Sequence, residues 1–289
     1  MFDWFDDHAK LQTWLAGRPT MLADAAVVAA RASWPGHCDA CGLATLFAVP
    51  GGAAFDDRPN LREGLRCPRC RMSARQRMLF SAFAATVPAG SDVQGAVLER
   101  WSPLFHAIRR RNRRATGSEY LSPAHRGGRR YLWHPPSRPW RARIARHESI
   151  TALSYADASQ DFVVHSDVLE HVADTGGALR ECRRVMRPGA AMLFTAPFFP
   201  RNAATVVRAA LSGDGEIVPL LPPEYHGDGV HAGGIFTFYN FGWDLFGAMR
   251  AVFTRVEVGI AHDPGRGLLP ADSVDHPANM PAIVFRAFR

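Results

Sequence analysis

The sequence predicts an α/β fold in which a mainly parallel sheet is covered by helices on both faces. Between residues 95 and 260, short apolar runs suited to buried strands alternate with segments of helical periodicity. Strands that alternate with helices favour βαβ units, and such units build parallel sheets. The chain has 289 residues, 47% of them hydrophobic, which is enough for one such domain and a small appendage.

The N-terminal part predicts two helices followed by a segment rich in loops. Apolar residues recur at near-helical spacing over residues 8–32, and Pro19 is expected to divide this stretch. Cysteine pairs, glycines and prolines between residues 34 and 73 predict a compact knob, after which a helix resumes over 75–85. The predicted domains are a helical segment (1–33), the knob (34–75) and the α/β domain (76–289).

Seven strands are predicted in the α/β domain. They cover residues 95–99, 115–120, 150–153, 162–165, 191–195, 256–260 and 282–288, with helices over 104–111, 175–186 and 241–251. Asp174 or Thr175 is expected to cap the second of these helices, and Pro188-Gly189 to end it. Residues 123–147 predict a basic insertion without periodicity. No helix is predicted between the last two strands, which favours an antiparallel hairpin at the sheet edge.

Positive charge is concentrated in one stretch. Arg100 to His147 contains 13 arginines and one acid, Glu119, so its charge is 13 − 1 = +12 and the rest of the chain carries 7 − 12 = −5. Such a stretch can attract nucleic acid, phosphorylated substrates or an anionic membrane. Lys10 is the only lysine, so a general preference for arginine explains the cluster as well. Nucleic-acid binding is therefore an alternative and not the favoured hypothesis.

The chain shows no sign of a membrane segment or a secretion signal. It contains no run of 18 or more apolar residues, and its first residues are acidic where a signal peptide needs positive charge. We therefore expect a cytoplasmic protein that does not insert into a membrane.

Four of the five cysteines predict a structural zinc site. Cys38 and Cys41 form one Cys-x-x-Cys pair, and Cys67 and Cys70 form another after a gap of 25 residues. Two such pairs complete a tetrahedral site of four thiolates, which favours Zn²⁺. All four positions are filled by protein, so no place is left for a catalytic water. Cys182 lies at helical spacing with Leu179 and Val185 and is expected in the core.

Two stretches resemble the class I S-adenosylmethionine (SAM)-dependent methyltransferase family. They are Ser154–Val172, which includes Leu169-Glu170-His171, and Ala178–Gly189, which ends in Arg-Val-Met-Arg-Pro-Gly. The chain is similar, more narrowly, to a branch with an N-terminal zinc ribbon. That likeness rests on Cys67–Arg77, Gly117–Leu121, Pro222–Asp228 and Phe241–Asp244. The resemblance implies a Rossmann-like, seven-stranded class I methyltransferase fold and SAM as cofactor.

The resemblance also implies where the cofactor binds. The usual Gly-x-Gly turn after the first strand is replaced by Leu98–Pro103, which lacks glycine. Glu119 ends the second strand, where the family places an acid that binds the ribose hydroxyls, although it could equally balance neighbouring arginines. Ser149 falls at the adenine position and Glu148 could substitute for it; a solvated surface role for Glu148 is equally consistent. The cofactor-binding candidates are Glu99, Trp101, Ser102, Glu119, Tyr120, Glu148, Ser149, Ser166 and Asp167.

The catalytic candidates lie in two places. His171 could act as a general base, because imidazole titrates near neutrality, or it could support the cofactor loop. Glu170 is expected to be structural in this family pattern. The Pro222–Asp228 loop concentrates acids, a phenol and an imidazole, and His231 follows it, which is typical of substrate sites. The catalytic candidates are His226, His171, Glu224 and Tyr225.

Two functions compete at this point. The favoured one is methyl transfer from SAM to an oxygen or nitrogen of a small molecule or glycan, with His226 or His171 as base. The alternative is a methyltransferase fold without catalysis, which binds nucleic acid or a protein partner through the zinc knob and the arginine-rich insertion. The absent glycines favour the alternative, and the 222–228 loop favours the enzyme.

Overall fold

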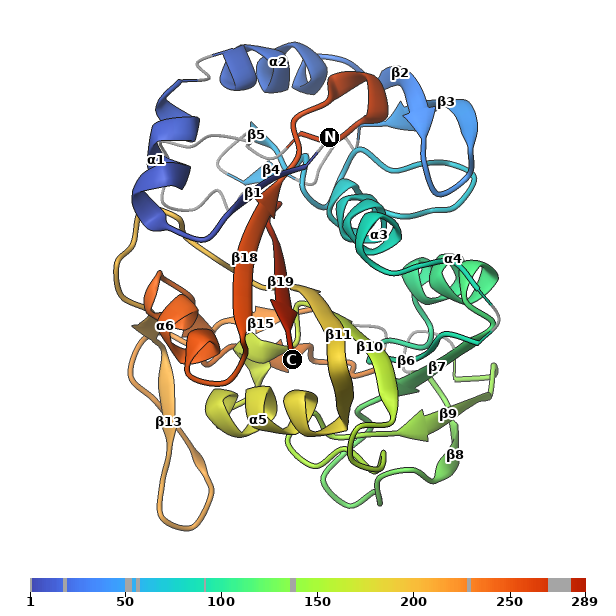
Figure 1. Cartoon of the computed structure of the whole chain (residues 1–289), viewed down its shortest axis with the longest axis vertical. Coiled ribbons are helices and arrows are strands. Elements are labelled where there is room, and N and C mark those ends of the chain that lie inside the picture. The colour runs from blue at the N-terminus through green and yellow to red at the C-terminus, as the bar shows by residue number, and fades with distance from the viewer. Residues whose placement is uncertain are drawn as a thin grey trace.

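A nine-stranded sheet forms the centre of the computed structural model, which describes residues 2–17, 20–49, 54–55, 58–90, 92–135, 139–227, 230–269 and 282–289 (Figure 1). The strand order is β1-β18-β19-β11-β10-β6-β7-β9-β8. The strands are β1 (Asp3–Phe5), β6 (Gln94–Val97), β7 (Arg114–Glu119), β8 (Arg130–Trp133), β9 (Arg143–His147), β10 (Gln160–Ser166), β11 (Met186–Thr195), β18 (Arg255–Ile260) and β19 (Val284–Phe288).

Seven of these strands make the sheet expected from the resemblance. β9, β7, β6, β10 and β11 are successive parallel neighbours, and β19 pairs antiparallel with both β11 and β18. β19 is thus the one reversed strand of the seven, as the hairpin prediction required. β19 lies between β11 and β18, and the hairpin is not at the sheet edge, because β1 adds antiparallel to β18 and forms that edge.

Each face of the sheet has its own hydrophobic core. One core packs α1 (His8–Ala16), α5 (Thr175–Val185) and α6 (Asp244–Arg250) against one face, and the other packs α3 (Ala74–Thr86) and α4 (Pro103–Arg111) against the opposite face. Neighbouring strand residues alternate between the cores: Val163 faces α5, and Val164 faces α3 and α4. Cys182 is buried in the first core, as predicted.

The predicted third strand is wrong. Residues 150–153 form a turn, and the strand parallel to β7 is β9, which lies inside the supposedly unstructured basic insertion together with β8. The edge position explains the error. Arg143, Ile144 and Arg146 of β9 are at least partly exposed, so the strand lacks the apolar run of a buried one.

The helix expected over 175–186 is α5, and Asp174 is its N-cap, accepting a hydrogen bond from the Gly177 N–H. Pro188 and Gly189 lie beyond it, in the first residues of β11. The helices expected over 75–85, 104–111 and 241–251 are α3, α4 and α6. The N-terminal helical stretch gives α1 and α2 (Thr20–Ala29), consistent with a division near Pro19, which itself lies outside the described residues.

The cysteine knob packs closely against the rest of the chain. Its hairpin of β2 (Ser33–Cys38) and β3 (Leu43–Ala48) contacts the 3-10 turn η2 (Pro264–Arg266). The core around Cys38 and Cys67 includes Ala25 from α2 and Leu269 from the C-terminal part. The domain boundaries stay a prediction, but the knob shares one core with residues far from it in sequence.

Short elements complete the described chain. They are β4 (Ala54–Phe55) with β5 (Arg58–Pro59), β12 (Val206–Val207) with β17 (Tyr239–Asn240), β13 (Ala209–Leu211) with β14 (Ile217–Pro219), β15 (Tyr225–His226) with β16 (Ile235–Phe236), and the 3-10 turn η1 (Leu169–His171). Among the helices that the structure describes, none is long and apolar enough to cross a bilayer.

Gly95 provides a test of the packing between β6 and β10. A Cβ atom at this position would lie 2.4 Å from ring carbons of Phe162, a side chain that is fully buried. Gly95→Ala should therefore lower the free energy of unfolding by about 1–3 kcal/mol, as overpacking typically does. Urea denaturation measures the change. Gly213→Ala is the matched control, because its Cβ would meet nothing within 4 Å; equal losses in both variants would contradict the packing.

Candidate active site at the carboxyl ends of β6 and β10

The strand order reverses between β6 and β10. From β6 the chain proceeds to β7 on one side, and from β10 it proceeds to β11 on the other. In such sheets the crevice beyond the carboxyl ends of the strands at this reversal is the usual ligand site. The side chains that follow these strands are Glu99 after β6, and Ser166 and Asp167 at the end of β10.

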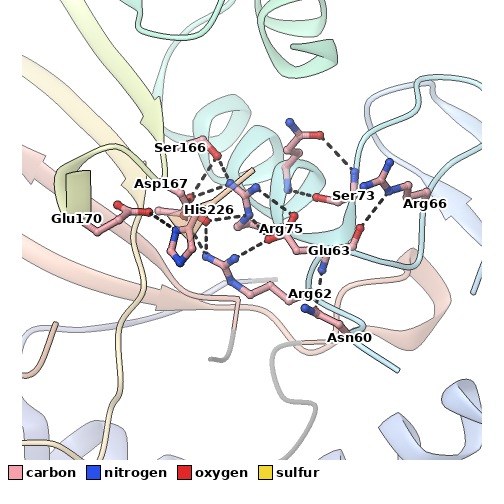
Figure 2. Close-up of polar contacts among 12 residues, drawn as sticks. Asn60, Arg62, Glu63, Arg66, Ser73, Arg75, Ser166, Asp167, Glu170 and His226 are labelled. Atoms are coloured by element: carbon pink, nitrogen blue, oxygen red, sulfur yellow. Dashed lines mark hydrogen bonds and ion pairs between the residues drawn. The ribbon is translucent and has the colours of Figure 1, made fainter. Parts of the chain in front are cut away.

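A buried network of four charged side chains occupies the β10 end of this crevice (Figure 2). Arg62 Nη2 donates to both carboxylate oxygens of Asp167 at 2.9 Å, and Arg75 Nη2 donates to Glu63 Oε2 at 3.1 Å. Arg75 Nε lies 3.4 Å from Asp167 Oδ2, and its Nη1 also bonds Ser166. Two guanidinium groups and two carboxylates thus balance in charge.

The network fixes the ionisation of Asp167. Burial opposes the charged form, but the guanidinium groups of Arg62 and Arg75 outweigh it and hold the pKa of Asp167 well below its ordinary value. The backbone of Asp167 has φ 50°, a left-handed conformation that is uncommon for residues other than glycine. Asp167 was predicted to face a cofactor; the structure places it against two arginines, one of them from the knob.

The knob therefore reaches the crevice directly. Arg62 and Glu63 lie on the segment between β5 and Cys67, and the Arg62 side chain is 6% exposed. Arg75 lies in the first turn of α3, whose N-terminus is fixed by a capping box between Ser73 and Gln76. The second cysteine pair and the basic start of α3 thus position one side of the candidate site.

Glu99 is the carboxyl group at the end of β6. Its Oε1 is buried and has no hydrogen-bond partner among the described residues. Burial raises the pKa of Glu99 to about 8, although the Arg75 guanidinium favours the charged form. A carboxyl group in this environment would gain a partner from any ligand that brings a cation or a hydrogen-bond donor.

The loop after β6 is held by Glu119, at the end of β7. Glu119 Oε1 accepts a hydrogen bond of 2.8 Å from the Trp101 N–H. Ser102 is the N-cap of α4, its Oγ accepting from the Phe105 N–H at 3.1 Å, and Pro103 occupies the first helical turn. The Ser-Pro pair where glycine is usual thus begins the helix. Tyr120 follows on the same edge and is 47% exposed.

The adenine candidates have other contacts. Glu148 is 3% exposed and bonds Arg146 Nε at 2.7 Å and the Ser154 N–H at 2.8 Å, which excludes the solvated surface role. Ser149 Oγ lies 2.9 Å from Thr151 Oγ1, in the turn after β9. The contacts leave the binding role of both residues a prediction.

The catalytic candidates form one cluster beside the network. His171 ends η1, and His226 lies in β15, opposite Ile235 of β16. Residues 237 and 238 connect the two segments by backbone hydrogen bonds. The Thr237 N–H donates to the Glu224 carbonyl at 2.9 Å, and the Phe238 N–H donates to the Glu170 carbonyl at 2.7 Å.

Within this cluster the side chains differ in burial. Glu170 is fully buried, and burial raises its pKa well above the ordinary value for glutamate. His226 Nε2 lies 3.0 Å from Glu224 Oε1. Tyr225 points outward by comparison, being 59% exposed, and its ring packs edge-on against Phe236. Asp228 lies outside the described residues, and His231 Nε2 contacts the Leu121 carbonyl oxygen at 3.1 Å.

The four cysteines converge as the spacing predicted. Cys38 Sγ lies 3.7 Å from Cys70 Sγ, and Cys41 Sγ lies 3.8 Å from Cys67 Sγ; all four are free thiols. Thiolates about 2.3 Å from a tetrahedral Zn²⁺ stand about 3.8 Å apart. Both pairs use the same turn, since Gly42 and Arg71, each directly after the second cysteine, have φ 66° and 65°. The donor set and its geometry therefore fit zinc.

Sequence reasoning missed the arginines of the site. Arg62 and Glu63 lie in the knob without a recognisable pattern, and Arg75 was noticed only as part of a basic helix. Glu170 was expected to be structural, a role that stays a prediction, and it is the fully buried carboxyl of the candidate cluster. The signal that could have found Arg75 is a cationic residue in the first turn of a helix, where the helix dipole disfavours it unless carboxylates surround it.

Comparison with known proteins gives one family. Residues 109–194 match the methyltransferase domain model. A relative from Mycolicibacterium smegmatis, described as a probable S-adenosylmethionine-dependent methyltransferase, is 42% identical over 52 residues, which are 18% of this chain and 20% of the relative. The chain thus spans about a fifth of the length of this curated relative.

Solved methyltransferase structures are matched at low sequence identity. An S-adenosylmethionine-dependent methyltransferase from Mesorhizobium loti is 17% identical, with 72% of this chain and 96% of that chain covered and a TM-score of 0.43. The 1,6-didemethyltoxoflavin-N1-methyltransferase from Burkholderia thailandensis is 14% identical, with 75% and 78% covered and a TM-score of 0.39.

Glu99 makes a prediction about pH. Its pKa in the folded protein is raised to about 8 from 4.5, so the stability that this group contributes is present below pH 4.5 and is lost as the pH rises through 8. Between these limits the free energy of unfolding should fall by at most about 1.4 kcal/mol per pH unit more than in Glu99→Gln. Urea denaturation at pH 5, 6.5 and 8 measures both proteins, and identical slopes would contradict the buried, unpartnered carboxyl.

Proposed function

We propose that this chain, which carries a class I SAM-dependent methyltransferase domain, binds SAM and transfers its methyl group to an oxygen or nitrogen of a small molecule or glycan. The observation that carries the proposal is the Glu99 carboxyl at the reversal of strand order, whose Oε1 is buried and has no hydrogen-bond partner among the described residues. The acids Glu119, at the end of β7, and Asp167, after β10, lie at the same edge of the sheet.

The crevice fits the cofactor in charge. SAM carries an ammonium group, which would donate to the unsatisfied Glu99 Oε1 and add its positive charge to that of the Arg75 guanidinium. Glu119 is the candidate for the ribose hydroxyls, and its bond to the Trp101 N–H orients the carboxylate and the loop together. SAM supplies an activated methyl group on a sulfonium leaving group, so the protein's task is mainly to position the two reactants in line.

A hydroxyl or protonated amine acceptor must also lose a proton. The Glu170, His171 and His226 cluster is the candidate for this step, because it joins a buried carboxyl to two imidazoles beside Asp167. His226 is 28% exposed and so faces an incoming acceptor more openly than His171, which is 9% exposed. The proposal assigns proton removal to this cluster, with His226 or His171 as the base.

The proposal includes a structural zinc ion at Cys38, Cys41, Cys67 and Cys70. The ion would stabilise the knob and, through it, the segment that carries Arg62 and Glu63. Because Arg62 holds Asp167, the zinc site would act on the crevice at a distance, by positioning residues and not by touching reactants.

A second function has one observation in its favour. The β8–β9 edge exposes Leu132, Trp140 and Ile144 beside exposed arginines such as Arg130 and Arg143. Aromatic and cationic side chains together are typical of surfaces that bind single-stranded nucleic acid. RNA binding that weakens steeply with salt would support a binding module in place of the enzyme.

Titration with SAM and with S-adenosylhomocysteine tests the enzyme. We expect micromolar binding by calorimetry, and a loss of at least tenfold in Glu119→Ala, because the carboxylate holds both loop and ribose. Glu216→Ala is the matched control, since Glu216 is an exposed glutamate on the distant β13–β14 hairpin. Failure of the unaltered protein to bind either compound would refute the proposed function.

Elemental analysis tests the zinc. Freshly purified protein should contain about one zinc per chain, and chelation should increase hydrogen exchange over residues 34–73 and in the backbone around Asp167, because the knob holds Arg62 against it. Absence of stoichiometric metal would overturn the zinc site. Zinc loss without faster exchange at Asp167 would overturn the link to the crevice.

A further inference from the structure

We propose that Glu170, His171 and His226 bind a divalent transition-metal ion, separate from the cysteine site, with coordination positions left open for an acceptor. One ligand atom from each of the three residues lies within 4.8 Å of the other two. Figure 2 shows Glu170 and His226 facing each other on the Asp167 side of the ion network. The binding of the ion stands on this geometry alone, whereas its chemical role rests on the proposed methyl transfer.

The hydrogen bonds of His171 fix which nitrogen can bind a metal. His171 Nδ1 lies 2.8 Å from the Phe236 carbonyl oxygen, which can only accept, so Nδ1 carries the proton. In the neutral ring the lone pair then lies on Nε2, which is 3.7 Å from Glu170 Oε1. A histidine that donates its other N–H to a backbone carbonyl is the usual arrangement of a metal ligand.

His226 is oriented in the same way by a carboxylate. Its Nε2 lies 3.0 Å from Glu224 Oε1, so Nε2–H donates to the carboxylate and Nδ1 presents its lone pair. His226 Nδ1 lies 3.8 Å from Glu170 Oε1, the same oxygen that His171 approaches. A lone pair from each of the two imidazoles is thus aimed at one carboxylate oxygen.

Glu170 completes the set and lacks any other partner. It is fully buried, and neither carboxylate oxygen has a hydrogen bond among the described residues. The separations of 3.7 and 3.8 Å are too long for hydrogen bonds to either ring. A buried carboxyl group with two unsatisfied oxygens gains a partner when a cation binds between it and the two imidazoles.

The ligand types indicate the class of ion. Two imidazoles and one carboxylate suit Zn²⁺, Co²⁺ or Fe²⁺, and three protein ligands leave at least one position open. Donors on one such ion stand about 3.0–3.4 Å apart, given bonds of about 2.0–2.1 Å. Each imidazole nitrogen must therefore approach Glu170 Oε1 by a few tenths of an ångström from its separation of 3.7 or 3.8 Å. His226, 28% exposed, gives the ion a route from solvent. An ion here would occupy the lone pairs of both imidazoles, so it would act, in place of a histidine base, as a Lewis acid that lowers the pKa of an acceptor hydroxyl.

Cobalt binding tests the site. The zinc-containing protein is titrated with Co²⁺ without SAM, by calorimetry and by absorption. We expect one equivalent to bind with d–d bands but without thiolate-to-cobalt charge transfer, which would signal exchange at the cysteines. Glu170→Gln and His226→Ala should each weaken binding at least tenfold, and thermal melting checks that both variants fold.

The matched control is His262→Ala. His262 Nε2 lies 2.8 Å from Asp24, and this histidine–carboxylate pair is not part of the proposed three-residue site. Replacing His262 should therefore leave cobalt binding unchanged. Three results would each overturn the site. They are no cobalt binding by the unaltered, zinc-containing protein, cobalt binding only with thiolate-to-cobalt bands, and unchanged cobalt affinity in the folded His226→Ala variant. SAM binding is measured separately on zinc-containing protein without added cobalt: its absence refutes the proposed function, and its presence without cobalt binding refutes only this site.

Discussion

The pair between Arg62 and Asp167 is the contact on which the arrangement of the crevice depends. It joins the cysteine knob to the end of β10, and both partners are largely buried. Removing one partner of a buried pair leaves an uncompensated charge, which typically costs about 3–5 kcal/mol. Because Arg75 and Glu63 share the network, the knob, α3 and the sheet hold their positions together.

The site has a centre of ion pairs and two ends with unsatisfied carboxyl oxygens. The Arg62, Glu63, Arg75 and Asp167 network pairs two guanidinium groups with two carboxylates. Glu99 on one side and Glu170 on the other are carboxyl groups in buried surroundings with unsatisfied oxygens. The ion pairs in the middle hold the two ends at a fixed separation. The unsatisfied carboxyl oxygens at each end gain a partner only when a ligand binds, so this arrangement suits the binding of two ligands side by side.

Most of the fold could be predicted because its strands are buried. β6, β10 and β11 are apolar runs, and the cysteine spacing alone located the zinc-binding geometry. The third strand could not be found, since β9 is near an edge and reads as Arg-Ile-Ala-Arg-His. In the site, Glu99, Glu119 and the two histidines were recognised from their place after strands and in a dense loop. Arg62 was not recognised, because its role depends on the ion pair with Asp167, which lies 105 residues away in the sequence.

The knob's core closes with residues that follow it at long range in the sequence. Arg77 donates to the carbonyls of Leu65 and Gly267, Arg266 pairs with Asp39, and Leu269 packs beside the cysteines. On the ribosome, residues 34–73 emerge long before residues 266–269 are made. The cysteine pairs therefore stay partly uncovered until residues 266–269 have been synthesised. A metal ion that needs the closed knob would be captured only after that point, and the crevice would close no earlier.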